Sequence, residues 1–183
     1  MNSVLAALRE GRLLELPADG KESALQSLAG ALAVHPAIPA GVEPFGEIAK
    51  RERESNTGIG MGVAVPHLAA KTDSGSLCCV VGWSPRGIDY GAEDKDDVHL
   101  VFMYYIPAGK MGAYLKEVSS LAQAVKQHGG VGLIERAPNL SAVRSQLEEW
   151  IQSAQGEEIH SSPAHLIKLG AKNTPPSMEA TRG

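Results

Sequence analysis

The segment 55–67 constrains the fold of this chain more than any other stretch, because it places glycine at three alternate positions and ends in proline and histidine. The three glycines, Gly58, Gly60 and Gly62, allow positive φ angles and a close approach of another segment. The residues that follow, 63–65, alternate as a half-buried strand does. The pattern therefore predicts a glycine-rich turn that leads into a short strand.

Two residues at the end of this segment mark a candidate site. Pro66 has no N–H group, so we expect the sheet ladder to stop there. His67 would then lie at a strand end, on the rim of the sheet, where a side chain is held rigidly and still meets a partner. His67 is therefore the first candidate for a functional residue.

The composition favours one ordinary globular domain. A chain of 183 residues, with 43% hydrophobic and 21% charged residues, is long enough for one buried core and short for two. The net charge of −4 gives no basic surface for nucleic acid or anionic lipid. No apolar run reaches about 18 residues, and acidic residues come too early for a signal peptide, so we expect a cytoplasmic protein without membrane insertion.

The cysteines and histidines indicate no metal site. Cys78 and Cys79 are the only cysteines, and their adjacent positions in an apolar run place them on opposite faces of a strand as two free thiols. The five histidines other than His67 have no metal-ligand spacing. We expect neither a metal nor a cofactor.

Helical and strand patterns alternate along the chain. Strands are expected at 12–16, 76–83 and 98–106 in addition to 63–65, and helices at 21–34, 42–51, 112–128 and 140–151. The run 76–83 is apolar throughout, which is typical of a central strand buried on both faces. This interleaving predicts an α/β fold, a single domain with a small mixed β-sheet flanked by helices on both sides.

The domain is expected to cover residues 13–151. Residues 1–12 are interpreted as an N-terminal lead-in, and residues 152–183 as a disordered tail, because Ser, Pro, Glu, Gly and Thr dominate there. Within the domain, the helix at 112–128 is expected to bury the apolar residues Leu115, Val118, Leu121, Ala122 and Val125.

These residues resemble a known family, the type-2 enzyme IIA domains of the fructose, mannitol and nitrogen-regulatory class in the bacterial phosphoenolpyruvate-dependent phosphotransferase system. The resemblance rests on Arg51-Glu52, Thr57–Gly60, Gly62–His67, Gly87–Tyr90 and the strand at 98–107. It covers roughly residues 13–150 and implies the mannitol-type fold. It also implies that His67 accepts a phosphoryl group from a histidine phosphocarrier protein.

The chemistry of the residues agrees with this role. A neutral imidazole attacks phosphorus without a separate base, and the protein then mainly positions the reactants and stabilises charge. Arg51 is expected to hold phosphate oxygens with its guanidinium. Uncharged donors are expected from the hydroxyls of Ser55 and Thr57 and from the N–H groups around Gly60 and Gly62, in the manner of an anion nest.

The sequence departs from the family pattern at one position. Tyr114 stands where the family has a second histidine, which faces the phosphorylated one. A tyrosine donates one hydrogen bond to a phosphate but brings no positive charge. We therefore expect slower transfer with Tyr114 as a supporting residue.

Three functions follow from these observations. The leading hypothesis is a phosphoryl carrier of the nitrogen-regulatory type, because no transporter segment or IIB-like domain shares the chain; its partners would be the phosphocarrier and a IIB domain or a regulatory target protein. The first alternative is a phosphorylation-incompetent regulatory module that acts by binding. The second is a sugar-specific IIA that feeds a separate IIB/IIC permease.

Overall fold

The fold is a mixed six-stranded sheet between two layers of helices. The computed structural model describes residues 1–71 and 75–160, the last six of them as backbone only. The strands are β1 (Leu13–Glu15), β2 (Gly58–Gly60), β3 (Val63–Ala64), β4 (His67–Ala69), β5 (Cys78–Ile88) and β6 (Val98–Ile106). Their order is β1-β5-β6-β3-β2, and β4 also pairs with β6. β5 runs antiparallel to β6, whereas β3 and β4 run parallel to it, which confirms the predicted mixed sheet.

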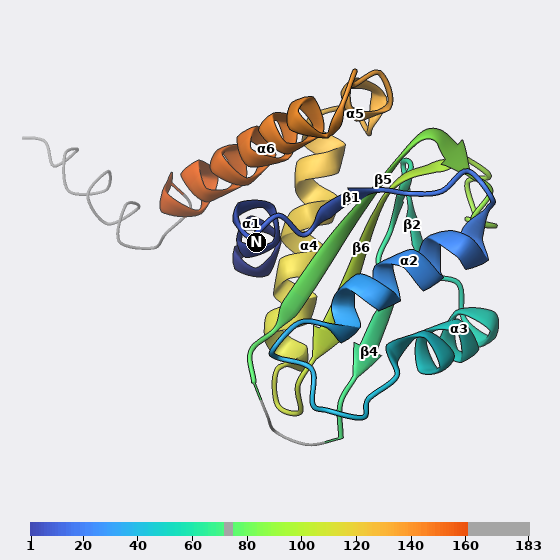
Figure 1. The fold of residues 1–183 in the computed structure, drawn as a ribbon. Coiled ribbons are helices and arrows are strands. Elements are labelled where there is room, and N and C mark those ends of the chain that lie inside the picture. Colours follow the sequence, from blue (N-terminus) through green and yellow to red (C-terminus); the bar gives the residue numbers. More distant parts are fainter. Residues whose placement is uncertain (72–74, 161–183) are drawn as a thin grey trace, which may run out of the picture.

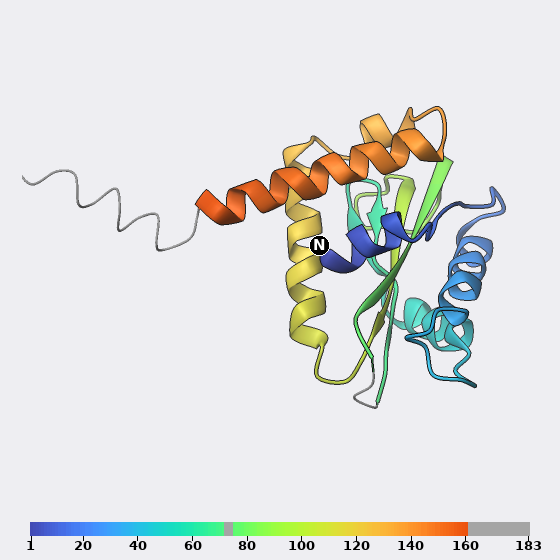
Figure 2. The same cartoon turned by 60° about the vertical axis from the view of Figure 1, so that its left-hand side comes forward.

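Helices cover both faces of the sheet (Figure 1). One face carries α1 (Asn2–Arg9), α4 (Met111–Gln127), the short α5 (Gly132–Glu135) and α6 (Leu140–His160), and the other carries α2 (Lys21–Ala33) and α3 (Pro44–Glu54). Figure 2 shows the two layers from the side, with α6 extending past the edge of the sheet. The predicted fold class is confirmed. Within the described residues, none of these helices has the length and apolar character that a membrane span requires.

Two hydrophobic cores lie on either side of the central strands. Cys79 belongs to the core under α1, α4 and α6, and Cys78 to the core under α2 and α3. Both cysteines are buried free thiols on opposite faces of β5, as predicted. Strands β5 and β6 are apolar along most of their length because helices exclude water from both of their faces.

The structure differs from the sequence prediction at the N-terminus. Residues 1–12 were expected to be a lead-in outside the domain, yet α1 buries Val4, Ala7 and Leu8 completely or nearly so. The carboxylate of Glu117 on α4 accepts hydrogen bonds from the backbone N–H groups of Ser3 (2.9 Å) and Val4 (3.1 Å). An acid at a helix N-terminus is favourable, so α1 is both packed and capped by α4.

The last two long helices also differ in detail from the prediction. Helix α4 turns Tyr114 and Glu117 inward, so Leu115, predicted to be buried, is 58% exposed. Helix α6 continues to His160 rather than ending at 151. The remainder of the predicted disordered tail, residues 161–183, lies outside the described residues.

The sheet ladder does not stop at Pro66 as predicted. Although proline donates no hydrogen bond, its carbonyl oxygen accepts one from the backbone N–H of Tyr104 (3.0 Å). Pairing with β6 therefore continues past Pro66, and His67 begins β4 instead of following the last strand residue. His67 is still held by the sheet, now from the first residue of a strand.

The packing of α1 can be tested by two leucine substitutions. Leu8 is 0% exposed and Leu115 is 58% exposed. Leu8→Ala should lower the free energy of unfolding by about 2–5 kcal/mol, because it removes buried contacts and leaves a cavity. Leu115→Ala should change it by less than about 0.5 kcal/mol. Urea denaturation measures both, and equally small losses would show that α1 contributes nothing to the core.

Candidate functional site

His67 lies against the first turn of α4. Its Nδ1 atom is 3.0 Å from the hydroxyl oxygen of Tyr114 and 3.2 Å from the carbonyl oxygen of Val65. The centroids of the two rings are 4.9 Å apart, with their planes tilted by 43°. The imidazole is partly buried, and these two contacts hold it at its Nδ1 atom.

These contacts determine which ring nitrogen carries the proton. The Val65 carbonyl oxygen can only accept a hydrogen bond, so we assign the proton of the neutral ring to Nδ1. With this assignment, the hydroxyl oxygen of Tyr114, which is 3.0 Å from the same nitrogen, accepts a second hydrogen bond from Nδ1–H. The lone pair is therefore on Nε2, which is the nucleophilic atom of His67.

The surroundings keep His67 neutral. Burial lowers its pKa below the ordinary value of 6.5, because an imidazolium is poorly solvated there. The Val65 carbonyl opposes this shift, the charge of Arg51 lowers the pKa further, and that of Glu52 raises it. The net result is a pKa below 6.5, so the lone pair is free at neutral pH.

Arg51 was predicted to be the cation of this site, and its charge acts on His67 in the structure. It is exposed near the end of α3, and its charge lowers the pKa of both His67 and Tyr114. A guanidinium close to a nucleophilic imidazole is suited to hold an incoming phosphate. Ser55 is the exposed residue that ends α3.

Tyr114 contacts the imidazole ring itself. Only 4% of Tyr114 is exposed, and its ring packs edge-on against Tyr104 with centroids 5.2 Å apart. Burial raises the pKa of Tyr114 to about 12, so its hydroxyl stays protonated at neutral pH. We expected Tyr114 to donate to a phosphate, whereas its hydroxyl lies on Nδ1 of His67, the nitrogen opposite the lone pair. Its contact orients the ring.

The glycine turn does not form an anion nest around His67. Gly60, Met61 and Gly62 all have positive φ angles (86°, 57° and 78°) and form the turn between β2 and β3. A carboxylate oxygen of Asp94 already accepts a hydrogen bond from the Met61 N–H group (2.7 Å). The Met61 N–H group of this turn is therefore already bonded to an acid of the protein itself.

The sheet register also separates this turn from His67. Val63, which follows the turn, pairs with Leu100, whereas His67 pairs with Tyr104. Four residues of a strand span about 13 Å at roughly 3.3 Å per residue. Figure 1 shows the same separation, with the turn and β4 toward opposite ends of the sheet. Gly60 and Gly62 thus shape the hairpin and lie away from the candidate nucleophile.

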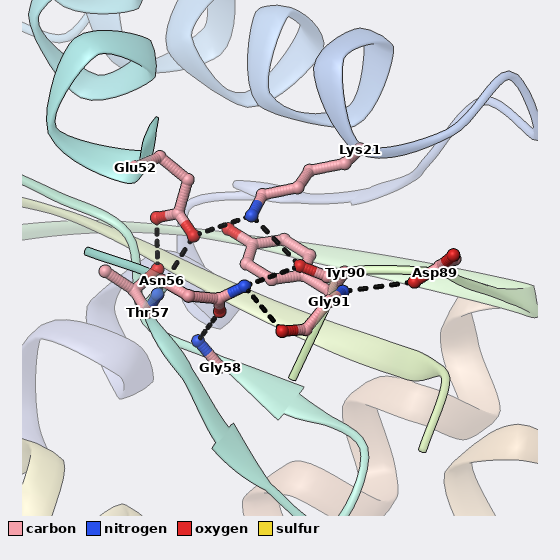
Figure 3. Close-up of polar contacts among 8 residues, drawn as sticks. All are labelled: Lys21, Glu52, Asn56, Thr57, Gly58, Asp89, Tyr90 and Gly91. Atoms are coloured by element: carbon pink, nitrogen blue, oxygen red, sulfur yellow. Dashed lines mark hydrogen bonds and ion pairs between the residues drawn. The ribbon is translucent and has the colours of Figure 1, made fainter. Parts of the chain in front are cut away.

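Thr57 is held by Glu52, a buried acid that the sequence analysis named as part of a motif but to which it gave no role. The carboxylate of Glu52 accepts hydrogen bonds from the backbone N–H (2.9 Å) and from the hydroxyl (2.5 Å) of Thr57. The same carboxylate forms an ion pair with Lys21, at 2.9 Å (Figure 3). The Thr57 hydroxyl therefore already has a partner, which does not agree with the predicted role as a phosphate donor.

The whole network joins the start of α2, the end of α3, the residues that lead into β2 and the segment 89–91 (Figure 3). Lys21 donates to the carbonyl of Tyr90 (3.0 Å) and lies 4.1 Å from the centre of its ring. Asn56 donates to the carbonyls of Tyr90 (2.7 Å) and Gly91 (2.9 Å) and accepts from the N–H of Gly58 (2.8 Å). Several of these residues belong to the segments on which the family resemblance rests, but the sequence did not show that they contact one another.

A metal centre finds no support in the described part of the chain. No group of three or more His, Cys, Asp and Glu side chains is arranged there to hold an ion. The described site consists instead of a neutral histidine, a tyrosine and an arginine.

The family model for the phosphoenolpyruvate-dependent sugar phosphotransferase system, EIIA 2, matches residues 12–150. The chain therefore belongs to this family. A fructose-specific EIIA component of the phosphotransferase system from Haloferax volcanii is 32% identical over 104 residues, which cover 56% of this chain and 66% of that protein. This chain thus spans slightly less than two thirds of that relative.

Solved structures share the fold at lower identity. The nitrogen regulatory protein IIA-Ntr from Neisseria meningitidis superposes with a TM-score of 0.61 at 20% identity, over 74% of this chain and 91% of that one. The mannitol enzyme IIA in its complex with phosphorylated enzyme IIB from Escherichia coli superposes with a TM-score of 0.60 at 19% identity, over 75% of this chain and 94% of that one.

The electrostatic role of Arg51 can be tested by NMR titration of the His67 ring. Arg51→Gln should raise the pKa of His67, because loss of a nearby positive charge makes protonation easier. Arg53→Gln, an exposed change on the same helix, should leave it unchanged. In the unaltered protein the pKa should lie below 6.5, and reactivity of the ring should fall as the pH drops through that value. An identical pKa in Arg51→Gln would place Arg51 outside the site.

Proposed function

We propose that this protein is a phosphoryl carrier that accepts phosphate on His67 from a histidine phosphocarrier protein. In the acceptor step, the lone pair of Nε2 attacks phosphorus, a P–N bond to His67 forms, and the P–N bond to the donor histidine breaks. Nδ1 keeps its proton and donates a hydrogen bond to the Val65 carbonyl oxygen. The observation that carries the proposal is this neutral, partly buried imidazole, which is held at Nδ1 and therefore has its lone pair on Nε2.

Other groups of the site stabilise the transferred phosphate. Arg51 provides the positive charge, because its guanidinium can hold two phosphate oxygens at once. The N-terminal end of α4 lies one turn from Tyr114, and helix N-termini favour anions. Ser55 is our candidate for an uncharged donor. The onward recipient is a IIB domain or a regulatory target protein, and the complex of the mannitol enzyme IIA with phosphorylated IIB supports the first.

We infer a regulatory role of the nitrogen-regulatory type from Tyr114. A phenol never carries a positive charge, and its pKa of about 12 keeps Tyr114 neutral at neutral pH. We therefore expect slower transfer than with a second histidine, which suits signalling better than sugar flux. The likeness to the fructose-specific relative favours the alternative of a sugar-specific IIA that feeds a separate IIB/IIC permease. A third possibility is a module that binds partners without being phosphorylated.

Labelling with phosphoenolpyruvate, enzyme I and the phosphocarrier tests the carrier function. The unaltered protein should take up one acid-labile phosphate, and His67→Ala should take up none, because the imidazole that accepts the phosphate is missing. His99→Gln, which changes another partly buried histidine, should be labelled normally. A chase with a purified IIB domain then asks whether the phosphate moves on, as sugar transport requires. No label on the unaltered protein would leave only the binding module.

Substitutions of Tyr114 test its contribution to the rate. Tyr114→His should raise the rate of transfer by on the order of tenfold, because an imidazolium at this position adds a positive charge near the transferred phosphate, which a phenol does not. Tyr114→Phe should lower the rate, since the ring of His67 loses an orienting contact. Tyr105→Phe removes a buried hydroxyl on the other face of the sheet and is the matched control. Equal rates for all four proteins would show that position 114 is not part of the site.

A further inference from the structure

A continuous series of hydrogen bonds joins the buried carboxylate of Glu52 to the imidazole of His67. Glu52 accepts from the N–H and the hydroxyl of Thr57. The carbonyl oxygen of Thr57 accepts from the N–H of Val65 (3.0 Å), and the carbonyl oxygen of Val65 accepts from Nδ1 of His67 (3.2 Å). Each group in this series is held by the one before it.

The Glu52 end of the series is rigid. Its side chain is 3% exposed and paired with Lys21, whose side chain is 26% exposed. Lys21 is itself fixed by the carbonyl and the ring of Tyr90. A buried charge is unfavourable unless its partners are well placed, so this arrangement allows few alternatives in position. Figure 3 shows the carboxylate between Lys21 and Thr57, where α3 leads into β2.

Glu52 also fixes the part of α3 that carries Arg51. Successive residues of a helix point about 100° apart, since a turn contains 3.6 residues. Glu52 points into the protein, and Arg51 is exposed and close enough to influence the pKa of His67. Anchoring Glu52 therefore sets the rotation of the last turn of α3 and the direction from which Arg51 approaches.

We propose that Glu52 is the positioning residue of this site: through Thr57 and Val65 it holds the proton of His67 on Nδ1, and through α3 it holds Arg51 beside the ring. Glu52 does not contact the phosphoryl group. Its contribution is to keep Nε2 as the attacking atom and the guanidinium within reach of the phosphate. The rate part of this inference rests on the proposed carrier function, whereas the state of the ring does not.

The test compares three variants with a control. Glu52→Gln keeps the shape but loses the charge that pairs with Lys21. The double variant Lys21→Met with Glu52→Gln leaves no unpaired buried charge and therefore keeps the fold measurable if the single change does not. Thr57→Val removes only the hydroxyl bond and keeps the backbone contacts. Glu54→Gln, at an exposed position of the same helix, is the control.

Nitrogen-15 NMR of the His67 ring in the unphosphorylated protein reads the position of the proton. The unaltered protein and Glu54→Gln should show one tautomer, with the proton on Nδ1. Glu52→Gln and the double variant should show a mixture of both tautomers, and Thr57→Val a smaller change. A folded double variant with the same single tautomer as the unaltered protein would overturn the proposal, whether or not the protein is a phosphoryl carrier.

The effect of Glu52 on the transfer rate is measured by kinetics with the labelled, phosphorylated phosphocarrier protein as the donor. Substitution of Glu52 should lower kcat on the order of tenfold, in proportion to the loss of one charge-assisted hydrogen bond, with KM for the donor unchanged. A raised KM with unchanged kcat would indicate that Glu52 supports docking and would contradict a positioning role. If the unaltered protein accepts no phosphate, the carrier function fails, and the NMR comparison alone decides the role of Glu52.

Discussion

The hydrogen bond from Nδ1 of His67 to the carbonyl of Val65 is the interaction on which the site depends. It spans only two residues, and it can form because the chain between them is bound to β6 on both sides of Pro66. A proline at this point costs the ladder one donor but keeps an acceptor, which Tyr104 uses. The sheet thereby presents a neutral histidine in one orientation, and the cores on its two faces keep the strands in place.

Much of the fold could be predicted from the sequence because its central strands are long apolar runs with few alternatives. Strand β6 and the two cysteines of β5 are clear examples, since a strand covered on both faces buries adjacent residues in different cores. Helix α1 was interpreted as a lead-in because its helical periodicity is weak over only eight residues, and its packing on the sheet could not be recognised. The buried face of α4 was misjudged because Tyr114 and Glu117 are polar, and each is buried against a polar partner that the local sequence does not reveal.

The candidate site could be predicted in part. His67 and Arg51 were found from residue type and from the resemblance to the family, and the structure brings Arg51 close enough to lower the pKa of His67. Gly60 and Gly62 were placed beside His67 because they are close in sequence, whereas the register of a hairpin decides where its turn lies. Glu52 was part of the recognised motif, but its contacts with Thr57 depend on how α3 meets β2, which no local pattern specifies.

Membership of the EIIA 2 family and the geometry of His67 lead to the same account, in which a neutral imidazole presents Nε2 to a phosphoryl donor. Its central claim concerns a single bond, and the most direct test is to determine which atom of the phosphorylated protein carries phosphorus. Phosphorus-31 and nitrogen-15 NMR of the labelled protein should show a P–N bond to Nε2 of His67. Phosphorus on Nδ1 of His67, or on another residue, would contradict the account.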